Sequence, residues 1–580
     1  MTTRPLSALT LAFAFAATSA LAADVRSSSP SLRIGPRGVT SLPSAAAAAP
    51  RSRAGALEAD SVRPGIDREA RHDAMLQKLI KERLAAMRAA GLAVNAPVAL
   101  ALPHVPSSPL SGRGDAFGFK GLSNFDQAGV NQGFSTEPPD QALCVGNGFV
   151  FEGVNSAFAV YNENGGLVVG PVQANAFFGV PFELNVSDPR CIYDKASDRW
   201  FVTMIEYPND FSHNHLEIAV SQTGDPTGVF NLYDIDVTHD GSDFNTGDCP
   251  CFGDQPLIGA DASGFYISTN SFGLFSFEGA QVYALSKKAL AAGGPTPVIR
   301  FDQLSSRLGS EFAISIQPST TPPGAQFAAD TEFFAQSMKL HKAESQLAVW
   351  ALHNTSKIDT DPDALTMSLA LTPSEVYVAP VPADQKEGPT PRAEMAAVDD
   401  SAPGAADEQD LAGNDQRLQQ VTYRDGQLWT ALGTASVGVG TPVRDAAAWF
   451  VINVSSSAMG TTANIAAQGY VAGPDSAHLL YPALAVNAAG EAAMVFTLTG
   501  PEFFPSAASW EFNSRSIHVL FPGQAAQDGF SAYVLNRPRW GDYSAAAVGP
   551  NGRIWLATEM IPGGARKRSA NWGTFISNDP

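Results

Sequence analysis

The chain has 580 residues, of which 44% are hydrophobic, and it carries a formal net charge of −20 with a pI near 4.8. This acidity argues against nucleic acid as a partner, because such binding depends on Lys and Arg that neutralise phosphates. It equally disfavours an anionic membrane surface. Cations, neutral saccharides and peptides remain open as ligands.

The first 22 residues have the features of a secretory signal peptide. Arg4 supplies a positive charge, residues 6–17 form a short apolar stretch, and Ala20-Leu21-Ala22 is a small-residue cleavage site. No later segment has the roughly 20 uninterrupted apolar residues of a membrane-spanning helix. We therefore expect a secreted protein, extracellular or periplasmic, without membrane insertion.

Residues 23–113 have the composition of a linker or pro-segment, with a run of Ala from Ala45 to Ala49, scattered Pro and Ser, and few aromatic residues. Most of this segment is expected to be disordered. One amphipathic helix is predicted over residues 67–90, where Leu76, Leu79, Ile80, Leu84 and Met87 share a face. Whether that helix belongs to a pro-segment, docks on the main domain or stands alone in a spacer is left open.

A repeated phrase fills residues 114–580: an apolar run, a polar turn ending in Gly, and a second apolar run. It is clearest from Asp254 through Gly264 and from Asp542 through Gly552. Looser copies open near Asp140, Asp188, Asp415 and Leu480, and one more unit is inferred at 330–351. Seven units, each long enough for four strands, predict an all-β fold, a seven-bladed β-propeller complete as a monomer. A strand within 116–134 would complete the last blade.

The four cysteines are Cys144, Cys191, Cys249 and Cys251. Export makes disulfides the expected state. Cys144 and Cys191 occupy similar positions in consecutive repeats and are the preferred pair. The remaining Cys249-Pro-Cys251 turn is either a rigid structural element or a redox-active or metal-binding one.

The opening Asp residues of the repeats should gather at one mouth of the central channel. Asp188, Asp254 and Asp542 are the candidate acid–base groups, because glycoside hydrolysis uses two carboxylates roughly 5 to 9 Å apart. The alternative is structural: each Asp accepts backbone N–H bonds and fixes the turn into its blade.

Three arginines lie beside these acids: Arg190, Arg417 and Arg539. Together they could hold a substrate carboxylate by two-point hydrogen bonds. Tyr543 follows Asp542 and is a candidate nucleophile, since a Tyr nucleophile helped by a carboxylate is sialidase chemistry. Internal Arg–Asp ion pairs are the other interpretation.

Asp240, Asp243, Asn245 and Asp248 concentrate oxygen ligands in one loop, which suits calcium. Their spacing differs from an EF-hand, and a solvated acidic loop is the alternative, so no cofactor is required. His213-Asn-His215 is too short a pattern to specify a metal. Trp200, Trp429 and Trp555 fall at equivalent points of their repeats, which indicates core packing within the blades.

Four phrases carry a resemblance to a known group: Pro138-Pro-Asp-Gln-Ala-Leu-Cys144, Ser187-Asp-Pro-Arg-Cys191, Cys249-Pro-Cys-Phe-Gly-Asp-Gln-Pro256 and Arg539-Trp-Gly-Asp-Tyr-Ser544. Over residues 114–580 the chain resembles exported bacterial seven-bladed β-propeller proteins related to the sialidase superfamily. The resemblance implies the fold and export, and it implies no established activity.

Two functions follow as hypotheses. The leading one is a secreted propeller that binds an extracellular glycan or a protein surface at the channel mouth and rim loops. The alternative is a glycan-cleaving enzyme, a sialidase-like glycoside hydrolase that uses the carboxylates and arginines of the mouth.

Overall fold

The structure is a computed structural model that describes residues 25–26, 32–48, 63–64, 102–112, 116–238, 251–273, 277–302, 304–306, 312–387, 410–438, 440–457, 460–527, 538–563 and 572–579. The expected signal peptide and the expected helix over 67–90 lie outside these ranges. Among the described residues, no helix has the length and hydropathy needed to cross a bilayer.

Consecutive strands pair antiparallel in groups of four, and within the described ranges these groups follow one another along the chain. Group 1 is β8 (Ala142–Gly146), β9 (Phe149–Val154), β10 (Ala157–Asn162) and β11 (Leu167–Gln173); group 2 is β12 (Asn185–Asp194), β13 (Arg199–Tyr207), β14 (His215–Ser221) and β15 (Phe230–Asp236); group 3 is β16 (Cys251–Ala260), β17 (Gly264–Gly273), β18 (Phe277–Ser286) and β19 (Thr296–Phe301). Group 4 is β20 (Gln317–Thr320), β21 (Thr331–Ser337), β22 (Glu344–His353) and β23 (Thr366–Tyr377); group 5 is β24 (Gln420–Arg424), β25 (Gln427–Ser436), β26 (Arg444–Ser457) and β27 (Gly460–Ala472). Group 6 is β28 (His478–Val486), β29 (Ala492–Gly500), β30 (Phe503–Glu511) and β31 (Ile517–Phe521); group 7 is β32 (Ala545–Val548), β33 (Ile554–Met560), β34 (Gly573–Asp579) and β6 (Phe117–Ser123). The fold is all-β, as predicted.

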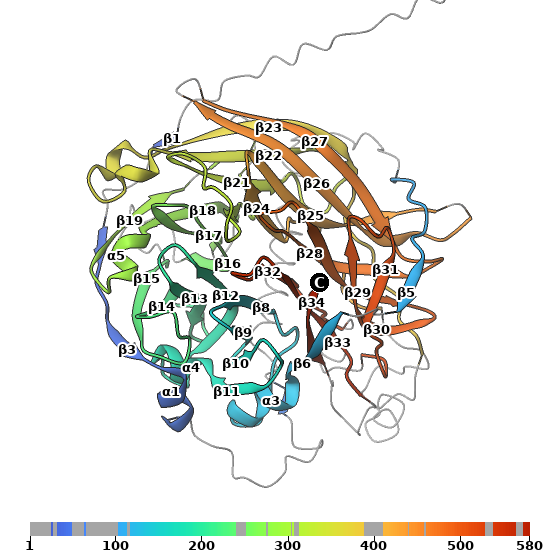
Figure 1. Ribbon diagram of the computed structural model, residues 1–580, viewed down its shortest axis with the longest axis horizontal. Coiled ribbons are helices and arrows are strands. Elements are labelled where there is room, and N and C mark those ends of the chain that lie inside the picture. The colour runs from blue at the N-terminus through green and yellow to red at the C-terminus, as the bar shows by residue number, and fades with distance from the viewer. Residues whose placement is uncertain are drawn as a thin grey trace, which may run out of the picture.

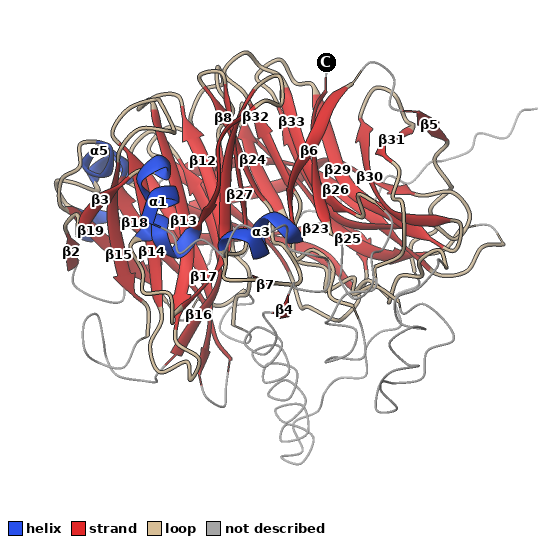
Figure 2. Ribbon diagram, turned by 90° about the horizontal axis from the view of Figure 1, so that it is seen from below, coloured by secondary structure: helices blue, strands red, loops and turns tan. Residues whose placement is uncertain are grey.

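The groups stand in a ring, with β8, β16, β24, β28 and β32 toward its middle (Figure 1). Seen from the side, the strands cross the ring from one face to the other (Figure 2). Parallel contacts of β20 with β16 and β24 join three groups into one 14-stranded sheet. The fourth unit begins at β20, upstream of the predicted start at residue 330, so the prediction missed its first strand.

The hydrophobic core lies between neighbouring groups. One cluster joins Phe201 of group 2 to Phe265 of group 3, whose rings stack 4.9 Å apart. Another joins Trp555 of group 7 to Val150 of group 1 and so closes the circle. Each group therefore buries both faces of its sheet against its neighbours, which is why apolar side chains fill these strands on both faces.

The strand β6 lies within the segment 116–134 that is expected to complete the last group, and it pairs with β34 from the C-terminal part of the chain. Glu152 in β9 secures the junction. Its buried carboxylate accepts hydrogen bonds from the backbone N of Leu122 (2.9 Å), from Gln141 Nε2 (3.0 Å), from the Tyr161 hydroxyl (3.1 Å) and from the Thr574 hydroxyl. A buried carboxylate with donors from β6, β10, β34 and the residue just before β8 ties these segments together.

Residues 32–48 and 102–112 form an N-terminal belt around the outside of the ring. β2 (Leu32–Ile34) adds to β19, β3 (Gly38–Thr40) adds to β15, and β5 (Leu110–Gly112) adds to β31. Helix α1 (Leu42–Ala48) follows β3 and buries Leu42 against group 1. The prediction of a disordered linker is wrong for these residues, because their backbone covers strand edges that would otherwise be open to other chains.

The remaining short elements lie at the ends and edges of the groups. They are β1 (Val25–Arg26), β4 (Arg63–Pro64), β7 (Phe134–Ser135), α3 (Asn124–Val130), α4 (Ala174–Phe178), α5 (Lys287–Ala291) and the 3₁₀ turns at Thr355–Lys357 and Pro362–Ala364. β1 pairs with β23, the outer strand of group 4.

Candidate functional site

One residue with left-handed backbone lies shortly before each innermost strand or within its first half. These residues are Asp140, Asp188, Gln255, Ser315, Asn414, Tyr481 and Gly541, with φ between 49° and 57°. Positive φ is uncommon for residues other than Gly and is kept only where the surroundings impose it. What repeats is thus a backbone conformation. In groups 3, 5 and 7 the left-handed residue is the immediate neighbour of Asp254, Asp415 and Asp542, respectively.

Asp188 is buried and holds groups 1, 2 and 3 together. Its carboxylate accepts from the Ser187 hydroxyl and from the backbone N of Gln255, each at 3.1 Å. Its own backbone N–H donates to Oδ1 of Asn155 at 2.8 Å, and Asn155 Nδ2 donates to Asp140 at 2.7 Å. These contacts fix the strand entries, which is the structural role weighed for these acids.

Arg417, which precedes β24, forms an internal ion pair with Asp415 and links group 5 to group 3. Its Nε and Nη2 donate to the two oxygens of Asp415 at 2.8 and 2.7 Å, and its Nη1 donates to Oε1 of Gln255. Burial raises the pKa of Asp415, but the charge and hydrogen bonds of Arg417 outweigh burial and leave that pKa below its usual value. Burial lowers the pKa of Arg417, but Asp415, together with Asp542 and Asp254, leaves that pKa above its usual value.

The carboxylate of Asp542 likewise accepts hydrogen bonds from neighbouring side chains, and it connects group 7 to group 5. Asn414 Nδ2 donates to its Oδ1 and Arg539 Nη2 donates to its Oδ2, both at 3.1 Å. Arg539 Nη1 donates to the carbonyl of Glu137 at 3.2 Å. Asp188, Arg417, Asp542 and Arg539 are therefore linked through hydrogen bonds, which we call the mouth network.

Tyr543 is buried, and its hydroxyl donates to the carbonyl of Pro189 at 3.0 Å. Burial raises the pKa of Tyr543 well above its usual value. A tyrosine nucleophile has to lose its proton, so this hydroxyl is poorly suited to that role. Asp254 lies on β16 opposite Asn270 and is partly exposed.

Arg190 differs from the other two arginines. Its guanidinium stacks on the ring of Tyr543, with Cζ 3.3 Å from the ring centroid. Its Nε is buried without a hydrogen-bond partner, and within the described ranges no carboxylate forms an ion pair with it. A guanidinium left in this state retains donors for a ligand.

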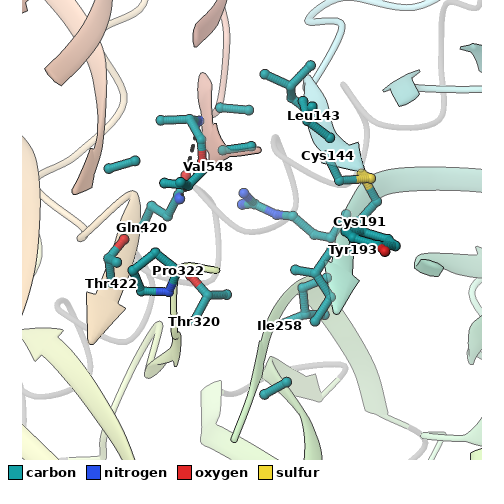
Figure 3. A pocket seen from close by; sticks show the side chains of 18 of the residues that line it. Leu143, Cys144, Cys191, Tyr193, Ile258, Thr320, Pro322, Gln420, Thr422 and Val548 are labelled. Carbon is teal, nitrogen blue, oxygen red and sulfur yellow. Dashed lines mark hydrogen bonds between the residues drawn. A yellow bond between two sulfur atoms is a disulfide. The ribbon is translucent and has the colours of Figure 1, made fainter. Parts of the chain in front are cut away.

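Arg190 lines a cavity of about 120 Å³ that is bounded by the innermost strands. Figure 3 shows this cavity from close by, with Ile258, Gln420 and Val548 on its wall. Every innermost strand contributes to its wall: Leu143, Val145, Ile192, Asp194, Ile258, Ala260, Gln317, Thr320, Gln420, Thr422, Ala485, Ala545 and Val548 are among the lining residues. Small and apolar side chains predominate. Because they lower the local dielectric constant, the electrostatic attraction between Arg190 and an anion is stronger there than in water.

Two other polar groups of the wall have close partners, whereas the side-chain oxygens of Gln141 and Gln317 are buried without one among the described residues. Asp194 forms an ion pair with Lys287 at 3.0 Å. Gln420 spans the channel to Ala546, donating to its carbonyl at 2.6 Å and accepting from its backbone N at 3.2 Å. Of the described charged side chains on the cavity wall, Arg190 is the one without an ion-pair partner.

The predicted disulfide Cys144–Cys191 is confirmed, with an S–S distance of 2.02 Å, and it joins β8 to β12 beside the cavity (Figure 3). Cys251 is itself disulfide-bonded. Cys249, the other half of the predicted turn, lies outside the described residues, and so does the calcium candidate formed by Asp240, Asp243, Asn245 and Asp248. Among the described residues, no group of His, Cys, Asp and Glu is arranged to hold a metal ion.

Sequence reasoning missed the buried glutamates near the mouth. Glu559 accepts the backbone N–H of Gly541 at 2.8 Å, and burial raises its pKa well above the usual value, helped by Glu137 and Asp542. Burial likewise raises the pKa of Glu152 to about 7 against its four hydrogen bonds. The sequence did contain a signal, which was a single Glu within an otherwise apolar strand. Glu is seldom buried unless it has partners.

No family model matches the chain, and no curated protein is similar to it. Among solved structures it is similar to a Trypanosoma rangeli sialidase in complex with sialic acid, at 12% identity and a TM-score of 0.34, over 75% of this chain and 59% of that one. The chain therefore spans less than two thirds of that sialidase.

Two further solved structures are similar over more of their length. The Dos1 propeller matches at 7% identity and a TM-score of 0.31, over 75% of this chain and 76% of that one. An exo-β-1,3-galactanase from Clostridium thermocellum matches at 8% identity and a TM-score of 0.28, over 79% of this chain and 95% of that one. The fold assignment rests on the strand pairing above, and these matches carry no argument about a ligand.

Proposed function

We propose that the chain is an exported seven-bladed β-propeller that binds the carboxylate of an extracellular ligand through Arg190. The observation that carries the proposal is the guanidinium of Arg190, which lines the central cavity without an acidic partner. A planar guanidinium holds a carboxylate by two parallel hydrogen bonds.

The blade count and export are part of the same proposal. Groups 1 to 7 each present their first strand to one cavity, and a core cluster joins group 7 to group 1. Export is supported by the signal-like first 22 residues and by the Cys144–Cys191 disulfide, because disulfides persist in oxidising compartments. Such a ring is complete as a monomer.

The size of the cavity limits what can enter it. Pockets that enclose a drug-sized ligand measure roughly 300–1,000 Å³, against about 120 Å³ here. Only the acidic end of a ligand fits, and the rest has to lie outside. A binding protein is favoured over a hydrolase because Asp188, Asp542 and Tyr543 are held in the mouth network.

Titration calorimetry tests the proposal with two matched ligand pairs: glucuronate with glucose, and triglycine with its amide. We expect binding of glucuronate, of triglycine or of both, and none of the partners that lack the carboxylate. Arg190→Gln should abolish it, whereas Tyr543→Phe should retain it, because Phe keeps the ring under the guanidinium. Equal binding of a partner without the carboxylate, or unchanged binding by Arg190→Gln, would overturn the proposal.

A further inference from the structure

An aromatic cluster lies between groups 5 and 6, away from the central cavity. Trp449 on β26 and Trp510 on β30 lie 4.8 and 4.7 Å from the ring of Phe512, and Trp429 on β25 lies 5.6 Å from it. Trp510 is buried, but Trp429, Trp449 and Phe512 are only partly buried. Large aromatic rings left partly open are common at binding surfaces.

This exposure sets Trp429 apart from its counterparts in other groups. Trp200 and Trp555 fall at equivalent points of the repeat and are fully buried. The prediction that all three serve core packing is therefore confirmed for Trp200 and Trp555 and is incomplete for Trp429.

The second open ring, Trp449, is held in a fixed orientation. It lies against the backbone of Gly469 on β27, where an added Cβ would come within 2.8 Å of the indole. A glycine at this position lets the ring lie flat along the strand. A ring fixed in this way loses little conformational entropy when a ligand stacks on it.

A row of amides continues the same face of the sheet. Gln427, Asn453 and Asn464 are register partners across β25, β26 and β27, two positions along from Trp429. Gln427 Nε2 donates to Asn453 at 3.0 Å, and Asn453 Nδ2 donates to Asn464 at 3.1 Å. Within the described residues, Oε1 of Gln427 and Nδ2 of Asn464 are left as one acceptor and one donor at the two ends of the row.

The charged groups beside this face are paired with one another: Arg424 at the end of β24 forms an ion pair with Asp425 at 3.3 Å, and Glu511 beside Phe512 lies 4.0 Å from His518. A fitting ligand is therefore uncharged, has a flat apolar face for the rings, and carries hydroxyls that both donate and accept. We infer that the face formed by Trp429, Trp449, Phe512 and the amide row is a binding site for a neutral oligosaccharide. The inference is independent of Arg190.

The test uses hexaoses of glucose, xylose, mannose and galactose, with tryptophan fluorescence and calorimetry on the full chain. We expect at least one hexaose to bind and Gln427→Ala or Trp429→Ala to weaken it about tenfold, the effect of one lost hydrogen bond or stacking contact. Gln468→Ala is the matched control, because Gln468 pairs with Phe450 on the opposite face of β27. It should bind normally.

Two outcomes would overturn the inference: no hexaose binding at millimolar concentration, or equal weakening by Gln427→Ala and Gln468→Ala. Gln427 is near the surface and contacts one side chain, so its replacement leaves the fold intact even if Trp429→Ala does not. Arg190→Gln should still bind the hexaose, which separates this site from the central one.

Discussion

Arg417 and Asp415 form a two-point ion pair at the mouth of the central channel, with hydrogen bonds of 2.8 and 2.7 Å. Asp188 and Arg190 have the same spacing in the sequence, yet they make no such pair. The difference lies in the backbone. Asp188 itself is left-handed, whereas in the second case the left-handed residue is Asn414, one position before Asp415. One arginine is thereby neutralised, and the other is left facing the cavity.

Removing Arg417 should destabilise the fold. Arg417→Gln leaves the carboxylate of Asp415 buried without its cation, and we expect the free energy of unfolding to fall by about 3 kcal/mol. Urea unfolding followed by circular dichroism measures this. Arg424→Gln is the control, because its partner Asp425 is exposed and such pairs contribute about 1 kcal/mol or less. Equal losses in the two variants would contradict the account.

Glu152 should make stability depend on pH. Burial raises its pKa to about 7 from 4.5, so the folded state binds the proton more tightly than the unfolded state. The stabilisation is complete below about pH 4.5 and is lost as the pH rises through 7. Glu152→Gln cannot titrate, so wild type should lose about 2 kcal/mol relative to this variant between pH 5 and 8. Glu502→Gln, at an exposed position, should follow wild type. Parallel profiles for wild type and Glu152→Gln would refute the assignment.

The belt should protect the outer strand edges. Leu42→Ala removes a fully buried side chain of α1, which costs about 2–3 kcal/mol in well-packed sites. Hydrogen exchange should then accelerate at the amides of β15, which pairs with β3 beside α1. Val39→Ala, at a residue 65% exposed, should change nothing. Unchanged exchange in Leu42→Ala would mean that the belt does not protect this edge.

The protein should not hydrolyse glycans. Asp188 and Asp542 each accept two hydrogen bonds from the mouth network, and the Tyr543 hydroxyl is committed to a carbonyl. A polysaccharide panel with reducing-sugar detection should show no release by wild type. Hydrolysis that disappears in folded Asp254→Asn and Asp542→Asn variants would reverse this conclusion and restore the enzymatic alternative.

Much of the fold could be predicted because each repeat is visible in the local sequence as an apolar run, a turn ending in Gly and a second apolar run. The hairpin predicted from Asp254 through Gly264 is β16–β17, and the pairing of Cys144 with Cys191 followed from their positions in the repeat. The belt could not be predicted, since β2 and β3 are three residues long and show no periodicity. These strands exist only because outer strands offer them unpaired backbone groups.

The site was harder to predict than the fold. The sequence offers candidate residues, but their contacts depend on the left-handed positions, which include Gln255 and Tyr481, residue types that do not signal that conformation. Nor could a spacing of two residues distinguish the paired Arg417 from the unpaired Arg190. Side-chain direction decided both roles.

The most direct test of the central claim follows the Nε–H signal of Arg190 by nuclear magnetic resonance, assigned as the one missing from Arg190→Lys. During titration with glucuronate or triglycine, this signal should shift and saturate along the calorimetric isotherm, while the signal of Arg417, already bound to Asp415, stays in place. A stationary Arg190 signal while an acidic ligand binds would contradict a binding site at Arg190.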